Sequence, residues 1–249
     1  MSGHSKWSTI KHKKAALDAK RGKSWSKVSR MITMAAKSGG NPDDNPRLRL
    51  AIDKAKAENM PKDTIEKAVK KGTGELEGES FEEVIYEGYA AGGIAILCQA
   101  TTDNRNRTVG EVRKIFERAG GNMGAAGCVA FMFKPRGVII VAADKADEEK
   151  IMEIALDAGA DDVNSSSTGH EITCNPDSFQ RVKEAVAAAG IEIASADMSM
   201  VSDMEITLDL ENARKVLKLI EALEEHEDIN AVYSNSNIPD AVMEKLAAE

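Results

Sequence analysis

The first 72 residues carry apolar side chains three and four positions apart, the spacing of short amphipathic helices. After a polar N-terminal arm, residues Lys13 to Lys20 are predicted to form the first of them. The boundary signals that follow are a break at Arg21-Gly22, an N-cap at Ser24, a stop at Gly39-Gly40, starts at Asn45-Pro46 and Pro61, and a stop at Gly72. Three or four such helices, each with one narrow apolar face, are expected to form a small bundle.

A glycine-rich linker, Gly72 to Gly78, leads into a segment in which the apolar residues have a different spacing. Apolar runs predict strands at Val84–Tyr89, Ile94–Thr102 and Val129–Phe133, with a helix over Val109 to Ala119. Near the C-terminus, the periods predict a strand over Ile206 to Leu210, a helix over Ala213 to Leu223 and a strand over Ile229 to Tyr233. Each of these two segments has strands but too few elements to cover a sheet.

The intervening segment repeats the order strand, helix, strand. Its strands are predicted at Val138–Val141, from Val163, at Ile172–Cys174 and from Ile191–Ile193, and its helices end at Gly159 and Gly190. Two βαβ halves in succession are typical of a ferredoxin-like unit with its helices on one face. The fold class is therefore α+β multidomain. We expect a helical bundle (1–78), a split α+β domain (79–135 and 204–249) and an inserted ferredoxin-like domain (136–203).

Charge is distributed unevenly along the 249 residues, whose net charge is −8. Residues 1–72 hold 18 Lys and Arg against 7 Asp and Glu, whereas the remainder holds 15 against 34. Such a split favours a polyanion as the partner of the basic part. No run reaches the roughly 18 apolar residues of a membrane helix, and no apolar segment marks a secretory signal. We therefore expect a cytoplasmic protein that has no membrane partner.

The three cysteines, Cys98, Cys128 and Cys174, lack the CxxC spacing of a zinc or redox site. They are expected to be small buried side chains in a reducing compartment. His4 and His12 have no carboxylate or cysteine at a spacing that would complete a metal site. We expect no metal, nucleotide or other cofactor, because neither a P-loop nor a dinucleotide fingerprint is present.

Basic residues crowd the N-terminal arm and the start of the bundle, where aromatic rings are interleaved with them. The candidate nucleic-acid-binding residues here are Lys6, Trp7, Lys11, Lys13, Lys14, Lys20, Arg21, Lys23, Lys27 and Arg30, with Arg47 and Arg49 further on. Dispersed cations bind phosphate backbones, and aromatic rings stack on unpaired bases. The alternative is a solvated charged face, and for Trp25 a place in the bundle core is favoured by its helical spacing.

A second candidate nucleic-acid-binding segment is the polar stretch from Thr101 to Thr108, which lies between a predicted strand and a predicted helix. Asp103 or Asn104 is expected to cap the helix. Arg105 and Arg107, beside the helix N-terminus, are able to clamp either a phosphate or an internal carboxylate, and the sequence leaves both roles open.

The remaining motifs favour structural roles. Gly120 to Gly127 is either a tip that enters a partner or, more simply, a helix stop with a bulged turn. Ser165–Ser167 near His170 and Glu171 is interpreted as a turn, since no nucleophile elbow is present. The acidic run that ends in Asp228 is interpreted as a solvated helix end. We therefore predict no catalytic residues, no small-molecule substrate and no enzyme activity.

Several motifs occur together in a fixed order: Gly3-His4-Ser5-Lys6-Trp7, Asn45-Pro46-Arg47-Leu48-Arg49, Tyr86-Glu87-Gly88-Tyr89, Thr102-Asp103-Asn104-Arg105-Asn106-Arg107-Thr108 and Gly127-Cys128-Val129-Ala130-Phe131. With them the chain resembles the YebC/PmpR family over essentially its whole length. The resemblance implies three domains, the third inserted into the second, in a cytoplasmic bacterial protein. Family members are described as DNA-binding transcriptional regulators and as ribosome-associated translation factors that relieve stalling at proline-rich stretches. Mitochondrial relatives activate translation of a cytochrome oxidase subunit.

These observations favour a non-catalytic regulator of gene expression that binds structured RNA in the ribosome, either ribosomal RNA or tRNA. Lysine is suited to phosphate as a point charge, whereas base readout prefers arginine, of which residues 1–72 have only four. A regulator that binds duplex DNA is the alternative. An enzyme and a pure protein scaffold are the remaining classes: the first would turn over a substrate, and the second would bind its partner independently of salt.

Overall fold

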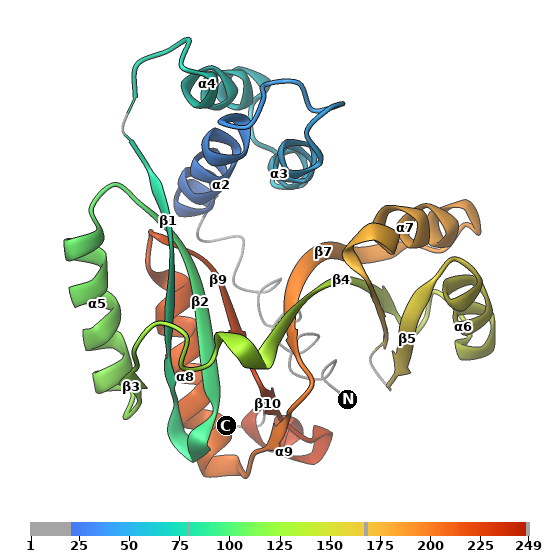
Figure 1. The fold of residues 1–249 in the computed structure, drawn as a ribbon. Coiled ribbons are helices and arrows are strands. Elements are labelled where there is room, and N and C mark those ends of the chain that lie inside the picture. Colours follow the sequence, from blue (N-terminus) through green and yellow to red (C-terminus); the bar gives the residue numbers. More distant parts are fainter. Residues whose placement is uncertain (1–20, 79, 167–168, 248–249) are drawn as a thin grey trace. The chain divides into compact units, whose positions relative to one another are not determined.

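The computed structural model describes residues 21–78, 80–166 and 169–247, with the elements shown in Figure 1. These residues form two compact units. The bundle-sheet unit comprises residues 21–128 and 215–232, and the ferredoxin-like unit comprises residues 129–214 and 233–247. The bundle and the first sheet thus belong to one unit, although a boundary between them was expected at residue 78. The three domain boundaries stay a prediction.

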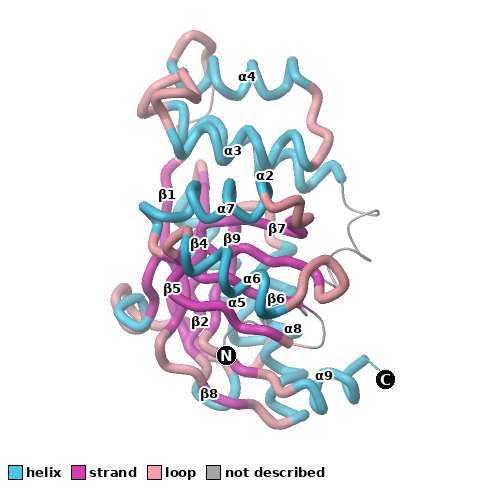
Figure 2. Tube along the Cα trace, turned by 90° about the vertical axis from the view of Figure 1, so that its right-hand side faces the viewer, coloured by secondary structure: helices cyan, strands magenta, loops and turns pink. Residues whose placement is uncertain are grey.

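Within the described residues, three helices form the bundle: α2 (Arg21–Ala36), α3 (Pro46–Ala57) and α4 (Lys62–Thr73). The helix expected over Lys13 to Lys20 lies outside the described residues. The predicted start of α3 is confirmed, since the Asn45 side chain accepts a hydrogen bond of 3.1 Å from the Leu48 amide and Pro46 follows at the first helical position. α4 follows Pro61, as expected, and ends at Gly74, whose φ of 83° is left-handed. α2 packs against both other helices (Figures 1 and 2).

The predicted start of the long helix is wrong. α2 is already helical at Arg21 and continues through Gly22 and Ser24, so neither the break nor the N-cap exists. A glycine inside a helix costs only about 1 kcal/mol relative to alanine. Burial of the helix face that carries Val28 and Ile32 outweighs that cost.

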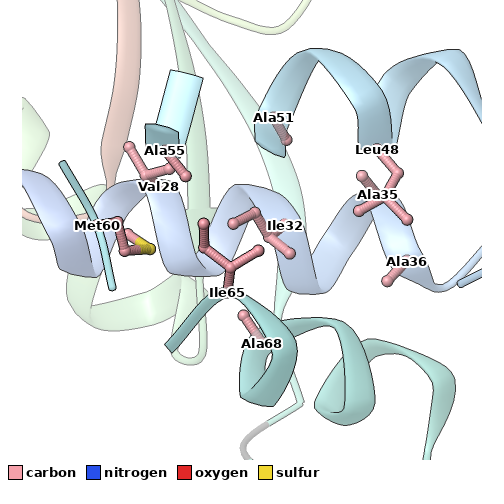
Figure 3. Close-up of a cluster of buried hydrophobic side chains, with 10 residues drawn as sticks. All are labelled: Val28, Ile32, Ala35, Ala36, Leu48, Ala51, Ala55, Met60, Ile65 and Ala68. Atoms are coloured by element: carbon pink, nitrogen blue, oxygen red, sulfur yellow. The ribbon is translucent and has the colours of Figure 1, made fainter. Parts of the chain in front are cut away.

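Small and branched apolar side chains fill the space between the three helices (Figure 3). The buried set is Val28, Ile32, Ala35, Ala36, Leu48, Ala51, Ala55, Met60, Ile65 and Ala68. Trp25 packs against this set, and its indole Nε1 donates a 3.1 Å hydrogen bond to the carbonyl of Glu58. The predicted core role of Trp25 is therefore confirmed.

The first sheet has the strand order β3-β1-β2-β9. Its strands are β1 (Glu82–Tyr89), β2 (Ala95–Thr102), β3 (Asn122–Met123) and β9 (Ile229–Ser234). The helices α5 (Arg105–Arg118) and α8 (Leu210–Glu225) lie along it (Figure 1). Since β9 comes from the C-terminal segment and pairs with β2, the two incomplete halves share one sheet, as the sequence predicted.

The inserted segment has the predicted ferredoxin-like order. It consists of β4 (Phe133–Ala142), α6 (Glu148–Asp157), β5 (Ala160–Ser165), β6 (Gly169–Cys174), α7 (Phe179–Ala188) and β7 (Ile193–Ser202). The sheet is antiparallel with the order β5-β6-β4-β7, and α6 and α7 lie together on one side of it (Figure 1). The predicted helix exits have left-handed φ angles, 93° at Gly159 and 74° at Gly190.

Short elements complete the ferredoxin-like unit, and two of the expected strands differ. Ala130–Met132 is a 3-10 turn, with Val129 and Phe133 buried at helical spacing and Phe131 71% exposed, so β4 begins only at Phe133. The strand expected over Ile206 to Leu210 is only two residues long. This strand, β8 (Ile206–Thr207), pairs with β10 (Ser236–Asn237). The Asp209 side chain accepts from the Asn212 amide and caps α8, which explains why the strand stops there. The terminal helix α9 (Asp240–Ala247) was not predicted.

No helix in the described ranges is long and apolar enough to cross a membrane.

Close packing of α2 on α4 depends on Gly72, which gives a testable prediction. A Cβ atom at this position would lie 2.6 Å from the Cβ of Ala36 and would overlap the carbonyl oxygen of Thr33. We expect Gly72→Ala to destabilise the bundle by about 1–3 kcal/mol, measured by urea unfolding followed by circular dichroism. Gly110→Ala is the matched control: it lies inside α5 with no atom within 4 Å, so it should stabilise by about 0.5–1 kcal/mol. Equal effects of the two substitutions would contradict the close approach.

Candidate nucleic-acid interface

Much of the predicted basic arm lies outside the described residues. This applies to Lys6, Trp7, Lys11, Lys13, Lys14 and Lys20. Arg21 and Lys23 lie in the first turn of α2. The nucleic-acid role of all these residues stays a prediction.

Basic side chains on one face of α2 contact the end of α8, the α8–β9 connection and the residue that precedes β1. Lys27 donates to the carbonyl of Glu224, Arg30 donates to Asp228 at 2.7 Å, and Lys37 donates to the carbonyl of Phe81 at 2.8 Å. These positions are three and seven residues apart, so they share a face of the helix. Some of the basic side chains of the bundle are therefore hydrogen-bonded to other residues of the same chain.

Asp228 is the centre of these contacts, and its side chain is 0% exposed. Its two carboxylate oxygens accept hydrogen bonds from Arg30 (2.7 Å), from Arg107 (2.8 Å) and from the Thr108 hydroxyl (2.7 Å). We call these four residues the Asp228 cluster. It joins α2, the first turn of α5 and the residue that precedes β9.

The expectation that Asp228 belongs to a solvated helix end is wrong. α8 ends at Glu225, and Asp228 lies in the connection that turns into β9. The Asp228 amide donates to His226 Nδ1, and its carbonyl accepts from the Thr101 amide. Neighbouring Glu227, whose side chain is 63% exposed, does fit the expectation. Only the strand pairing brings Asp228 under the arginines, and no local signal marks it.

Electrostatics hold Asp228 in its ionised form. Burial raises the pKa of Asp228. The hydrogen bonds from Thr108 and Arg107 and the charges of Arg107 and Arg30 lower this pKa by more than burial raises it, so it lies below its ordinary value. The pKa of Asp103 is lowered as well, chiefly by its hydrogen bond from Arg107. Arg30 also lies over the ring of Phe81, 5.5 Å from the ring centroid, and donates to the carbonyl of Glu227.

The two arginines of the polar stretch divide between the roles that the sequence left open. Arg107 clamps internal carboxylates, at 2.8 Å from both Asp103 and Asp228. Arg105 is exposed and forms no ion pair with any residue that the structure describes. Asn104 is the N-cap of α5, since its side chain accepts from the Arg107 amide at 3.1 Å, as predicted.

The two arginines of α3 also contact the chain itself. Arg47 is paired with Glu83, and both side chains are exposed. Arg49 donates to the carbonyls of Pro42, at 3.1 Å, and of Asp43, at 2.7 Å. The Arg47–Glu83 ion pair lies at the surface, where ion pairs are weak.

A cationic row on α4 was missed by the residue-level prediction. Lys67, Lys70 and Lys71 are exposed on the side of the helix opposite the buried Ile65 and Ala68. Within the described residues none of the three forms an ion pair. The signal was present as the sequence Lys-Ala-Val-Lys-Lys, whose lysines share one helical face.

The glycine-rich loop from Gly120 to Gly127 is attached to β1. Gly120, with φ 74°, ends α5 as expected, and β3 pairs with Gly88 and Tyr89. The buried Glu87 carboxylate accepts from the Gly127 amide at 2.6 Å, and the Tyr89 hydroxyl donates to the carbonyl of Cys128. The predicted helix stop is confirmed, and the loop is held by hydrogen bonds on both sides of its tip.

His170 has the contacts of a structural histidine. Its Nδ1 lies 2.8 Å from the Ser165 hydroxyl and its Nε2 lies 3.0 Å from the carbonyl of Ala146. The carbonyl can only accept, so Nε2 donates and Nδ1 accepts from Ser165. Both ring nitrogens are used within the chain, which supports a structural role for this histidine. The described residues contain no group of three His, Cys, Asp or Glu side chains arranged to hold a metal ion.

Comparison with known proteins covers nearly the whole chain. A family model described as the TACO1/YebC protein N-terminal domain matches residues 5–75, and one described as the TACO1/YebC second and third domain matches residues 81–236. A "probable transcriptional regulatory protein" of Geobacter sulfurreducens is 55% identical over 247 residues, 99% of this chain and 100% of that protein. One of the same name from Treponema pallidum is 55% identical over 240 residues, covering 96% of this chain and 98% of that protein.

A solved structure is also similar. The crystal structure of a conserved hypothetical protein from Aquifex aeolicus has a TM-score of 0.81 and 48% sequence identity, and covers 90% of this chain and 93% of that one. Such similarity supports the α+β multidomain fold.

Loss of the Asp228 charge should destabilise the bundle-sheet unit strongly. Asp228→Asn preserves the side-chain volume but leaves Arg30 and Arg107 without their shared carboxylate, so we expect about 3 kcal/mol less stability in urea unfolding. Glu227→Gln is the control, because that exposed carboxylate lies 3.9 Å from Arg30 and should contribute about 0.5 kcal/mol or less. A loss no larger than that of the control would show that the cluster contributes little.

The same cluster predicts acid sensitivity. The folded-state pKa of Asp228 lies below its unfolded value of about 3.9, so its contribution is complete above that pH and is lost as the pH falls through the folded pKa. Asp103 acts in the same direction. Urea unfolding from about pH 6 to pH 2 should therefore show a smaller loss of stability for Asp228→Asn than for the parent. Parallel profiles would argue against this assignment.

Proposed function

Because the chain belongs to the TACO1/YebC family, we propose that it is a non-catalytic, nucleic-acid-binding regulator of gene expression. Its working partner is structured RNA in the ribosome, ribosomal RNA or tRNA, and its role is to relieve stalling at proline-rich stretches. The ribosomal role and the proline specificity rest on the family resemblance. The nucleic-acid role rests on the arrangement of charge in the bundle.

The observation that supports nucleic-acid binding most directly is the cationic row on α4. Lys67, Lys70 and Lys71 project from one face, and no described acidic side chain neutralises them. Lysines at a helix C-terminus also complement the helix dipole, but that interaction leaves their charge open to solvent. Exposed lysines on one face suit the phosphate backbone, which is bound through counterion release.

The arginines support RNA rather than sequence-specific duplex DNA. Reading base edges in the major groove relies on the forked donors of arginine. Of the four arginines in residues 1–72, three contact the chain itself: Arg30, Arg47 and Arg49. The exposed cations that remain are mainly lysines, which bind phosphates without reading sequence.

A DNA-binding transcriptional regulator is the second candidate. It is favoured by the printed names of the relatives, "probable transcriptional regulatory protein". The two candidates differ in the partner and not in the basic surface that would contact it.

Binding to RNA and DNA oligonucleotides at increasing salt provides the direct test. Each phosphate neutralised contributes about −0.7 to −0.9 to the slope of log K against log salt. We expect the triple variant Lys67→Glu, Lys70→Glu and Lys71→Glu, and the quadruple variant of Lys13, Lys14, Lys20 and Arg21 to Glu, to lose most of the affinity. The control with the same charge change as the triple variant is Lys114→Glu, Lys150→Glu and Lys218→Glu, at exposed positions elsewhere. Equal loss in the control would reject the bundle as the binding surface.

Sedimentation of cell lysate at moderate salt distinguishes the two candidates. The parent should migrate with ribosomal fractions and the glutamate variants should remain at the top of the gradient. In cells that lack the protein, a reporter with a proline-rich stretch should yield less product than the same reporter without it. Absence from ribosomal fractions, together with enrichment at discrete promoters in chromatin capture, would replace the RNA proposal with the DNA one.

A further inference from the structure

The segment between α4 and β1 has a charge opposite to that of the helix that it follows. Residues 74–83, which we call the acidic segment, contain five Glu and no Lys, Arg or His, whereas residues 67–71 hold three lysines. Figure 1 shows that this segment connects the bundle with the first sheet. Opposite charges attract each other within about 8 Å at physiological salt, so the acidic segment is able to interact with the basic residues of the bundle.

The first part of the acidic segment folds back over the last turn of α4. The Glu75 amide donates a 2.9 Å hydrogen bond to the carbonyl of Lys70. A Cβ atom at Gly78 would lie 3.3 Å from Cδ of Lys71, so the chain passes alongside this lysine side chain. Glu75 and Glu77 are exposed and form no ion pair with the lysines of α4 among the described residues. Their carboxylates therefore lower the positive potential of this surface without neutralising any one lysine.

The end of the acidic segment contacts cations of α2 and α3. Lys37 donates to the carbonyl of Phe81 at 2.8 Å. Arg47 forms an ion pair with Glu83, and the two side chains are 58% and 44% exposed. Both partners of this ion pair are therefore accessible to a polyanion in solution. The ion pair differs in this respect from the Asp228 cluster, whose carboxylate is removed from solvent.

The Glu83 carboxylate occupies Arg47 in the way that a phosphate group would. A guanidinium group binds carboxylates and phosphates through the same fork of N–H donors, so the two anions compete for it. Exposed ion pairs are weak, so a phosphate that is also held by neighbouring contacts is able to displace the carboxylate.

We infer that the acidic segment is an internal competitor of RNA for the bundle. Glu83 occupies Arg47 in the free protein, and a backbone phosphate displaces it when RNA binds. Glu75 and Glu77 weaken binding at the lysines of α4 through their charge alone. This inference deepens the proposed function and rests on it. Since the displacement of Glu83 is equally unfavourable for every ligand, it selects against anions that offer a single phosphate and in favour of RNA that offers several.

Binding of the full chain to an RNA oligonucleotide at low salt tests the role of Glu83. Glu83→Gln should raise the affinity by about twofold to fivefold, the contribution of an exposed ion pair. The slope of log K against log salt should increase in magnitude by about 0.7, because Arg47 then neutralises one more phosphate of a single strand.

Glu82→Gln is the matched control. It makes the same charge change at the next residue of β1, where the side chain is exposed and forms no ion pair among the described residues. It points to the other face of the strand and should leave the affinity nearly unchanged. Equal gains in the two variants would show a general effect of charge and would overturn the inference.

A double-mutant cycle with Arg47→Gln isolates the competition. If Glu83 acts by occupying Arg47, Glu83→Gln should give no gain in RNA affinity once Arg47 has been replaced. A gain that persists in the Arg47→Gln background would overturn the assignment. Circular dichroism provides the folding control, and neither substitution should lower the Tm appreciably, because the ion pair is exposed.

The double variant Glu75→Gln and Glu77→Gln tests the effect of charge alone. It should bind RNA more tightly than the parent at low salt, and the gain should disappear near 1 M salt, where the Debye length is about 3 Å. Unchanged affinity at low salt would remove these two residues from the inference.

Titration with inorganic polyphosphate separates this inference from the proposed function, since polyphosphate offers phosphates without bases or sugars. If Glu83→Gln binds polyphosphate more tightly than the parent does and neither protein binds RNA, the competition stands and RNA is rejected as the ligand. If RNA binds the parent and Glu83→Gln equally well, the proposed function stands and the competition is rejected.

Discussion

A buried carboxylate without counter-charges is costly, and the bundle-sheet unit is organised around one. Asp228 is removed from solvent and accepts hydrogen bonds from Arg30, Arg107 and Thr108. Since its charge must be matched, the cluster determines where α2 meets the sheet and how the first turn of α5 is oriented. A buried ion pair is weak evidence of net stability, but the loss of one partner is strongly unfavourable. The cluster therefore specifies one arrangement of three elements that are far apart in the sequence.

This arrangement changes how the uneven distribution of charged residues along the chain is interpreted. The basic N-terminal segment and the acidic remainder suggested a polyanion partner, yet Arg30 pairs with Asp228 and Arg47 with Glu83 inside the chain. Part of the asymmetry is therefore internal complementarity. The planar fork of arginine, matched to carboxylates, suits these internal contacts. Lysines such as Lys70 and Lys71 remain at the surface, where a hydrated point charge is able to neutralise a phosphate.

Family membership and the charge arrangement support different parts of the functional conclusion. The proposed role as a regulator of gene expression rests on membership in the TACO1/YebC family and on the names of its relatives. The proposed contact with a phosphate backbone, without base readout, rests on the arrangement of charge in the bundle.

Local signals and tertiary packing contributed different parts of this structure. The sequence by itself determined the caps at Asn45 and Asn104, the glycine exits at Gly159 and Gly190 and the order of the ferredoxin-like strands, because caps, turns and periods depend on neighbouring residues. Packing decided that α2 runs through Gly22 and that residues 130–132 turn rather than extend. Only the tertiary structure decided that Asp228 is buried beside Arg30 and Arg107. This burial depends on pairing between distant segments of the chain, which leaves no periodic trace in the sequence.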